Sequence, residues 1–239
     1  MAEYPSHAKI LHWRAAANPF DTGCSEYDGW FESNPLFRIE LAALRAVKTG
    51  LPHPFLEIGV GPGRFARELQ VDFGIDPAVS PLQLARSRSI MGIRGIGEQL
   101  PVCSGCLGTV FILFTLCFLA DPSLVLRECY RTLQQKGRLV IGLVPASSEW
   151  GKMIIRKKEE NHPFYHAAHL RSIAEVKSML AASGFSILES WSTLFQAPVD
   201  PPTIENPRPG HDEQAGFCVL VMTKKEASDD LTQPDHFDN

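Results

Sequence analysis

Three features that the sequence lacks narrow the class of protein. Its longest apolar run covers only residues 107–120, which is too short for a helix that crosses a bilayer. Positive charge is not in excess: the formal net charge is −4 and the pI is about 6.1, so the electrostatic footprint of a nucleic-acid-binding protein is missing. No cationic segment followed by an apolar one opens the chain, so secretion is not expected. These absences predict a cytoplasmic protein with no membrane or nucleic-acid partner.

Closely spaced cysteine pairs are also scarce. The chain has six cysteines, of which Cys103 and Cys106 form a single CxxC pair. A structural zinc site normally needs four ligands, usually from a second such pair, and none is present. We therefore expect no metal site, and reduced thiols of the kind found in the cytosol.

The length of 239 residues, with 44% hydrophobic and 21% charged residues, suits one globular domain, or at most two small ones. Segments with the apolar pattern of strands alternate with segments that have the pattern of helices. The expected strands are 55–58, 71–76, 91–96, 107–116, 138–144, 185–191 and 216–223. The expected helices are 35–47, 63–70, 80–88, 121–133 and 172–184, with a further helical insertion after residue 144. Such alternation predicts an α/β fold with parallel strands joined by crossovers.

Several residues mark where the expected helices begin and end. Ser80 is a candidate N-cap, as is Asp121 before Pro122. Ser172 and Glu175 have the spacing of a capping box. The segment 197–210 is expected to be a loop, because its prolines cannot donate the hydrogen bonds of a sheet.

Three glycines follow the first expected strand, at Gly59, Gly61 and Gly63. Ligands of open α/β sheets bind at the carboxyl ends of strands, so this is where a cofactor is expected. A phosphate-binding P-loop is excluded, because no Lys-Ser or Lys-Thr follows the glycines. A dinucleotide fingerprint is disfavoured, because Arg64 occupies the third fingerprint position, where close packing requires Gly or Ala.

Two acids accompany these glycines. Glu57 stands on the first expected strand, and Asp76 closes the second. A carboxylate at the end of the second strand can accept hydrogen bonds from a ribose diol, and Glu57 could pair with a cationic ligand group. Together they point to a cationic nucleoside.

At this point four motifs in order carry a family resemblance. The segments "LEIGVGPGRFA" (56–66), "GIDPA" (74–78), "GIGEQLP" (95–101) and "LADPSLVLRECYRTLQQKGRLVIG" (119–142) resemble those of class I S-adenosylmethionine (SAM) dependent methyltransferases of the methyltransferase type 11 kind, in particular a subgroup of small uncharacterised bacterial and archaeal members. The resemblance runs from about residue 27 to residue 223. It implies a Rossmann-like, seven-stranded mixed sheet whose last strand is antiparallel, with helices on both faces and a helical N-terminal cap.

The resemblance also implies domain limits and a set of cofactor residues. Residues 1–50 would form the cap, 51–225 the SAM-binding domain with a substrate-side insertion at 145–170, and 226–239 a disordered tail. The residues expected to bind SAM are Glu57, Gly59, Gly61, Gly63, Asp76, Pro77, Gly97, Glu98 and Thr115. Ile96 departs from the family pattern, which commonly has an acid there beside adenine, so backbone groups near Gly97 and Glu98 would contact the adenine.

The expected reaction is methyl transfer (EC 2.1.1.-) to a small molecule, by a monomer or a homodimer. An "NPPY"-type signature for nitrogens of nucleic acids and proteins is absent after the fourth expected strand. No catalytic residue can be named, because an enzyme that positions its acceptor does not require a general base. The favoured substrate residues are Tyr27, Trp30, Tyr165 and His169, and the weaker candidates are Phe31, Trp150, His162 and His166. Two alternatives stay open: a non-catalytic module that binds SAM or a nucleoside, and an NAD-dependent oxidoreductase.

Overall fold

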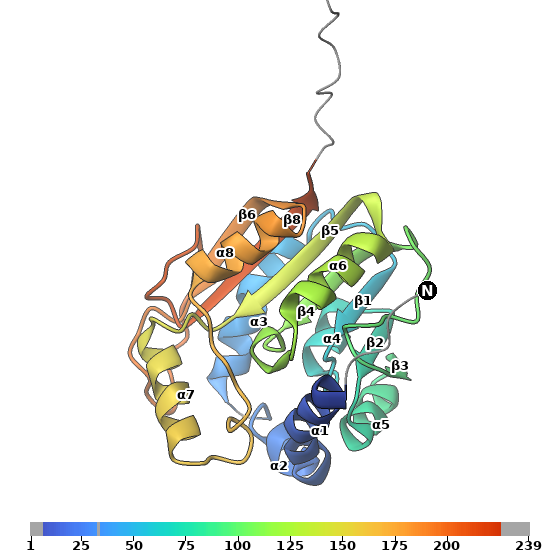
Figure 1. The fold of residues 1–239 in the computed structure, drawn as a ribbon. Helices are drawn as coiled ribbons and strands as arrows, with labels where there is room; N and C mark the ends of the chain where they lie inside the picture. The colour runs from blue at the N-terminus through green and yellow to red at the C-terminus, as the bar shows by residue number, and fades with distance from the viewer. Residues whose placement is uncertain (1–6, 33, 226–239) are drawn as a thin grey trace, which may run out of the picture.

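The computed structural model describes residues 7–32 and 34–225, which fold around one mixed sheet (Figure 1). The strands lie in the order β3-β2-β1-β4-β5-β8-β6-β7. Their bounds are β1 Phe55–Ile58, β2 Phe73–Asp76, β3 Met91–Arg94, β4 Leu107–Leu113, β5 Leu133–Leu143, β6 Phe185–Thr193, β7 Arg208–Pro209 and β8 Phe217–Lys224. The predicted tail 226–239 lies outside the described residues.

Strand directions confirm a Rossmann-like mixed sheet. Strands β1 to β5 pair in parallel, and β8 is inserted antiparallel between β5 and β6. The predicted number of seven strands is wrong, because the two-residue β7 adds an eighth at the edge, where Pro209 lies opposite Trp191. The segment 197–210 was expected to be all loop, yet an edge strand tolerates proline, since one side of it needs no sheet hydrogen bonds.

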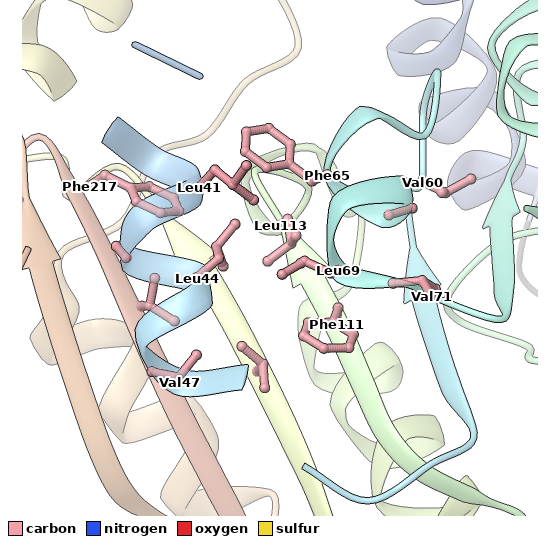
Figure 2. Packing of buried hydrophobic residues seen from close by; sticks show 14 of the residues in the cluster. Leu41, Leu44, Val47, Val60, Phe65, Leu69, Val71, Phe111, Leu113 and Phe217 are labelled. Atoms are coloured by element: carbon pink, nitrogen blue, oxygen red, sulfur yellow. The ribbon is translucent and has the colours of Figure 1, made fainter. Parts of the chain in front are cut away.

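Helices cover both faces of the sheet, as predicted. The helices are α1 His7–Thr22, α2 Cys24–Gly29, α3 Pro35–Lys48, α4 Arg64–Leu69, α5 Val79–Ser87, α6 Pro122–Thr132, α7 Glu149–Glu159 and α8 Ile173–Ala182, with a 3₁₀ turn at Leu116–Phe118. Figure 2 shows the core on one face, where Leu41 and Leu44 of α3 and Leu69 of α4 pack against Phe111 and Phe217 of the sheet. The alternate residues of the same strands face α6 and α8. This alternation follows from the two-residue period of a strand.

Local signals placed most helix ends correctly. Asp121 caps α6 by accepting from the Leu124 amide, and Ser172 forms the predicted capping box with Glu175. The predicted cap at Ser80 is wrong, because α5 begins at Val79. The Ser80 amide is instead satisfied by Asp21 of α1, whose Oδ1 lies 2.7 Å away. A carboxylate from a distant helix thus performs the capping role at the start of α5.

The prediction of reduced cysteines is wrong for one pair. Cys103 and Cys106, expected to be reduced, are joined by a disulfide. The turn between them contains Gly105 at φ +68° and brings their Cα atoms to 5.8 Å, a separation that a disulfide can bridge. The other four cysteines are free thiols.

Helices α1 and α2 lie beyond the carboxyl ends of the central strands, next to α5 (Figure 1). Helix α3 has a different position, because it packs on the sheet against β6 and β8. Helix α7 lies in the predicted insertion after β5. Within 7–32 and 34–225, no helix has the length and apolar character needed to cross a membrane.

Candidate functional site

A first cavity opens at the carboxyl ends of β1, β2 and β4. Eight of the nine residues predicted to bind a cofactor line it: Glu57, Gly59, Gly61, Asp76, Pro77, Gly97, Glu98 and Thr115. Ile96 lines it as well, between Gly95 and Gly97, and helix α1 contributes Trp13 and Phe20. Chain segments from 13 to 120 therefore converge on one pocket.

The three glycines of the loop after β1 serve three different needs. All have positive φ, at +73° for Gly59, +51° for Gly61 and +76° for Gly63, where side chains are strained. A Cβ on Gly59 would collide with Thr115, whereas a Cβ on Gly61 would meet open space in the cavity. Gly63 is the predicted residue that does not line the cavity; it packs against Ala85 of α5. Only Gly59 and Gly61 therefore shape the pocket itself.

Asp76 holds the glycine loop in place. Its Oδ2 accepts from the Gly61 amide at 2.9 Å, and its Oδ1 accepts from the Ala78 amide at 2.8 Å. Burial raises the pKa of Asp76 to about 6, although these two hydrogen bonds act to lower it. Each carboxylate oxygen has a further lone pair, so the group can still accept from a ligand in the cavity.

Glu57 is buried on β1 without any hydrogen-bond partner among the described residues. Its Oε2 is an orphaned buried oxygen, and the side chain lines the first cavity at 3% exposure. Burial, and then the neighbouring Asp76 carboxylate, raise the pKa of Glu57 well above its usual range. An unpaired buried acceptor is costly, and this oxygen is free to accept a hydrogen bond from a donor that enters the cavity.

A buried ion-pair cluster ties the N-terminal helices to this loop. Asp28 of α2 accepts from Arg64 Nε and Nη2 at 2.7 Å each, and from Arg88 Nη2 at 2.8 Å. Burial alone would raise the pKa of Asp28, but the two guanidiniums lower it overall. Arg64 is among the residues that line the first cavity, and its guanidinium pairs with a carboxylate on α2, which sequence reasoning did not identify. Its partner is 36 positions away, and no local pattern signals such a pair.

A second cavity of about 470 Å³ adjoins the first and lies between α2, α3, α7 and the segment around Tyr165. All four favoured substrate residues, Tyr27, Trp30, Tyr165 and His169, line it, as do the weaker candidates Phe31 and Trp150. The weaker candidates His162 and His166 do not line it. Its size is that of a small-molecule site.

Aromatic side chains line both cavities where the two adjoin. Both are lined by Phe20, Tyr27, Phe31, Phe114 and Phe118. Phe20 contacts Tyr27 and Phe118 edge-to-face, with ring centroids 5.0 and 5.3 Å apart. Burial raises the pKa of Tyr27 strongly, so its hydroxyl stays neutral. The two pockets therefore share an apolar, aromatic lining where they meet.

Glu40 of α3 is a second residue that sequence reasoning missed. It lines the second cavity at 5% exposure, and burial raises its pKa to about 8. A signal was available: Glu40 stands four residues after Leu36 and four before Leu44, on the apolar face of the helix.

No group of three His, Cys, Asp or Glu side chains in the described segments is placed to hold a metal.

These buried acids predict how stability varies with pH. Glu40, Glu57 and Asp76 all have raised pKa values, so the folded protein holds their protons more tightly than the unfolded chain does. Their stabilising contribution is complete below about pH 4 and is lost as the pH rises through the raised values. We expect the melting temperature of the ligand-free protein to fall between about pH 5 and pH 8.5, and the E40Q/E57Q double variant to flatten this slope. Melting curves across that pH range test this, and an equal slope in both proteins would contradict it.

The segment that carries this site matches a known family. Residues 56–141 match the model of a methyltransferase domain family, and this segment contains the glycine loop, Glu57 and Asp76. An uncharacterized protein of Mycobacterium tuberculosis is 38% identical over 210 residues, covering 85% of this chain and 74% of the relative. An uncharacterized protein of the archaeon Methanocaldococcus jannaschii is 34% identical over 208 residues, covering 87% of this chain and 99% of the relative.

A solved structure extends the match to the whole fold. The crystal structure of a Thermotoga maritima protein, described as a SAM-dependent methyltransferase and possible histamine N-methyltransferase, superposes with a TM-score of 0.81 at 32% identity. The superposition covers 88% of this chain and all of that one. SAM is accordingly the cofactor, and the chain belongs to the family of SAM-dependent methyltransferases.

Proposed function

We propose that this protein transfers a methyl group from SAM, bound in the first cavity, to a small molecule bound in the second. The observation that carries the proposal is the pair of adjoining cavities, one of which has the orphaned carboxylate of Glu57 and the other an aromatic lining. SAM supplies a methyl group on a positively charged sulfur. The protein holds the acceptor beside it and excludes water with the aromatic side chains that line both cavities.

The residues of the first cavity fit this cofactor. The orphaned Oε2 of Glu57 would pair with the cationic methionine part, and Gly61, where a Cβ would meet open space, lets the ligand approach the backbone. Asp76 would accept from the ribose hydroxyls with its remaining lone pairs. Pro77, Gly97, Glu98 and Thr115 would complete the contacts.

The second cavity suits a small acceptor rather than a macromolecule. Tyr27, Trp30, Tyr165 and His169 would contact that acceptor. In this assignment residues 51–225 form the SAM-binding domain, 145–170 supply the substrate-side insertion, and 1–50 supply the cap, of which α1 and α2 contribute lining side chains. We assign no general base and expect a monomer or a homodimer.

Replacing Asp76 tests the ribose contact. Asp76→Ala removes acceptors for the ribose and for the Gly61 amide, and hydrogen bonds to a charged group contribute about 1.5–3 kcal/mol. We expect SAM affinity to fall roughly 10- to 150-fold in calorimetric titration. Asp76→Asn, which keeps one acceptor oxygen, should lose less. Unchanged affinity in a folded Asp76→Ala protein would contradict the ribose assignment.

The same titration, with SAM, S-adenosylhomocysteine (the demethylated product) and NAD, tests the function as a whole. Binding of the first two in the micromolar range, with formation of the demethylated product when acceptors are added, would support methyl transfer. Binding without turnover on any acceptor would favour a non-catalytic regulatory module. Binding of NAD in place of SAM would contradict the proposal.

A further inference from the structure

Glu40 is the buried carboxylate of the second cavity. It is 5% exposed on α3 and lines the cavity, and within the described residues it makes no hydrogen bond or ion pair. An ionised carboxylate in this position is costly unless a positive or hydrogen-donating group faces it. The fold itself does not use Glu40, because no described backbone amide or side chain depends on it.

The basic groups of the cavity do not supply that partner. Lys157 lies over the Tyr165 ring, 5.9 Å from its centroid, and Arg171 donates to the carbonyls of Leu116 and His169. His169 itself is exposed, at the rim. The positive charges are therefore directed elsewhere, and the carboxylate remains available inside the cavity.

The surroundings of this carboxylate are aromatic. The lining of the cavity includes the aromatic side chains of Tyr27, Trp30, Phe31, Phe37 and Tyr165. Tyr27 and Tyr165 lie close enough to Glu40 for its charge to raise their pKa values further, beyond the effect of burial. Aromatic faces attract cations, most strongly where water is excluded. A carboxylate among such rings is complementary to an organic amine and poorly complementary to an anion.

We propose that Glu40 determines acceptor specificity by binding the ammonium group of a small aromatic or aliphatic amine in the second cavity. The inference rests on the proposed function, because it names the substrate class of the same site. It assigns Glu40 a binding role, in which one carboxylate oxygen accepts a hydrogen bond from the ammonium. The rings of Tyr27, Trp30 and Tyr165 enclose the carbon skeleton.

The experiment compares amines with alcohols of the same shape. 2-Phenylethylamine and 2-phenylethanol, and tryptamine and tryptophol, are titrated by calorimetry into the protein at about pH 8, with and without saturating S-adenosylhomocysteine. We expect each amine to bind about 10- to 150-fold more tightly than its alcohol, the ratio that 1.5–3 kcal/mol for a hydrogen bond to a charged group gives. In Glu40→Gln this ratio should fall to about threefold or less.

A matched variant controls for the loss of a carboxylate as such. Glu149→Gln removes an exposed carboxylate on α7 whose partner is Lys152, outside both cavities, and should leave the amine-to-alcohol ratio as in the original protein. Retained discrimination in Glu40→Gln, equal binding of amine and alcohol, or binding of neither would overturn the inference. Failure of S-adenosylhomocysteine to bind would instead contradict the proposed function. The amine-to-alcohol affinity ratio measured without S-adenosylhomocysteine would still test the role of Glu40.

Discussion

Glu57→Gln is expected to weaken SAM binding by about 30- to 4,000-fold and to raise the melting temperature of the ligand-free protein. The range corresponds to the 2–5 kcal/mol that removing one member of a buried charge pair costs. The opposite effect on stability follows because Glu57 has no partner of its own: its Oε2 is orphaned, and a carboxylate that is ionised in the unfolded chain must take up a proton on folding at neutral pH, which costs free energy. A neutral amide of the same shape avoids that cost.

The pH dependence of binding separates this role from a purely structural one. Burial and the Asp76 carboxylate raise the pKa of Glu57, so the ligand-free protein carries a proton there at neutral pH. Binding of a cation favours the ionised form and releases that proton, so SAM affinity should rise with pH. Titration in buffers of different ionisation enthalpy measures the proton release, which Glu57→Gln should reduce.

Glu68→Gln is the matched control for Glu57→Gln, because Glu68 is an exposed carboxylate on α4 that pairs with Arg45 outside the first cavity. It should change neither affinity nor proton release. Full SAM affinity in Glu57→Gln, with an unchanged melting temperature, would show that the carboxylate neither binds the cofactor nor destabilises the ligand-free protein.

The contrast between Glu57 and Asp76 could not be read from sequence. The sequence predicts a contact with the ligand for both acids. In the structure Asp76 accepts from the Gly61 amide, and Glu57 is left without a partner. Both acids follow from the motifs, but which one faces the loop depends on how two strands meet at the edge of the sheet.

The sequence predicts correctly those features that depend only on residues close together in the chain. The capping box at Ser172 and the cap at Asp121 depend on a few neighbouring residues, and the structure confirms them. The failure at Ser80 has the opposite cause, because the amide that needed a partner is satisfied by Asp21, 59 positions earlier. Strand β7 likewise depends on a distant segment, because it forms by pairing with the edge of β6.

Glu40 is marked in the sequence by its place among the apolar residues of α3. Apolar residues stand at helical spacings along α3, at Leu36, Ile39, Leu41, Leu44 and Val47, and Glu40 interrupts them. A charged residue among buried positions is more informative than the apolar residues around it, because burying it without a partner is costly. Sequence alone could not place it in a cavity, since α3 packs on β6 and β8, which are far from it in the chain.

Asp28→Asn is expected to destabilise the fold by about 3–5 kcal/mol, the usual cost of breaking a buried ion pair from one side. The Asp28 side chain is 11% exposed, and those of Arg64 and Arg88 are each 17% exposed. The amide cannot neutralise two guanidiniums and replaces one acceptor oxygen with a donor. For a chain of this length the loss corresponds to a fall of roughly 6–20 °C in melting temperature.

Two comparisons make this test specific. Glu68→Gln breaks the exposed pair with Arg45 and should cost about 1 kcal/mol or less, because solvent screens it. Replacing all three members, as Asp28→Leu with Arg64→Met and Arg88→Met, removes the unpaired charges and should recover much of the stability that Asp28→Asn loses. If Asp28→Asn melts within about 2 °C of Glu68→Gln, the cluster does not anchor α2.

The same variant should also weaken SAM binding. Asp28 connects α2 to Arg64, the first residue of α4, directly after the glycine loop, and Arg88 donates to the carbonyl of Pro62 within that loop. Loss of the carboxylate therefore loosens the loop from two sides, whereas no atom of Asp28 lines the first cavity. A fall in affinity without a change in proton release would distinguish this positioning role of Asp28 from the direct contact proposed for Glu57. Unchanged affinity in a destabilised Asp28→Asn protein would confine the cluster to stability alone.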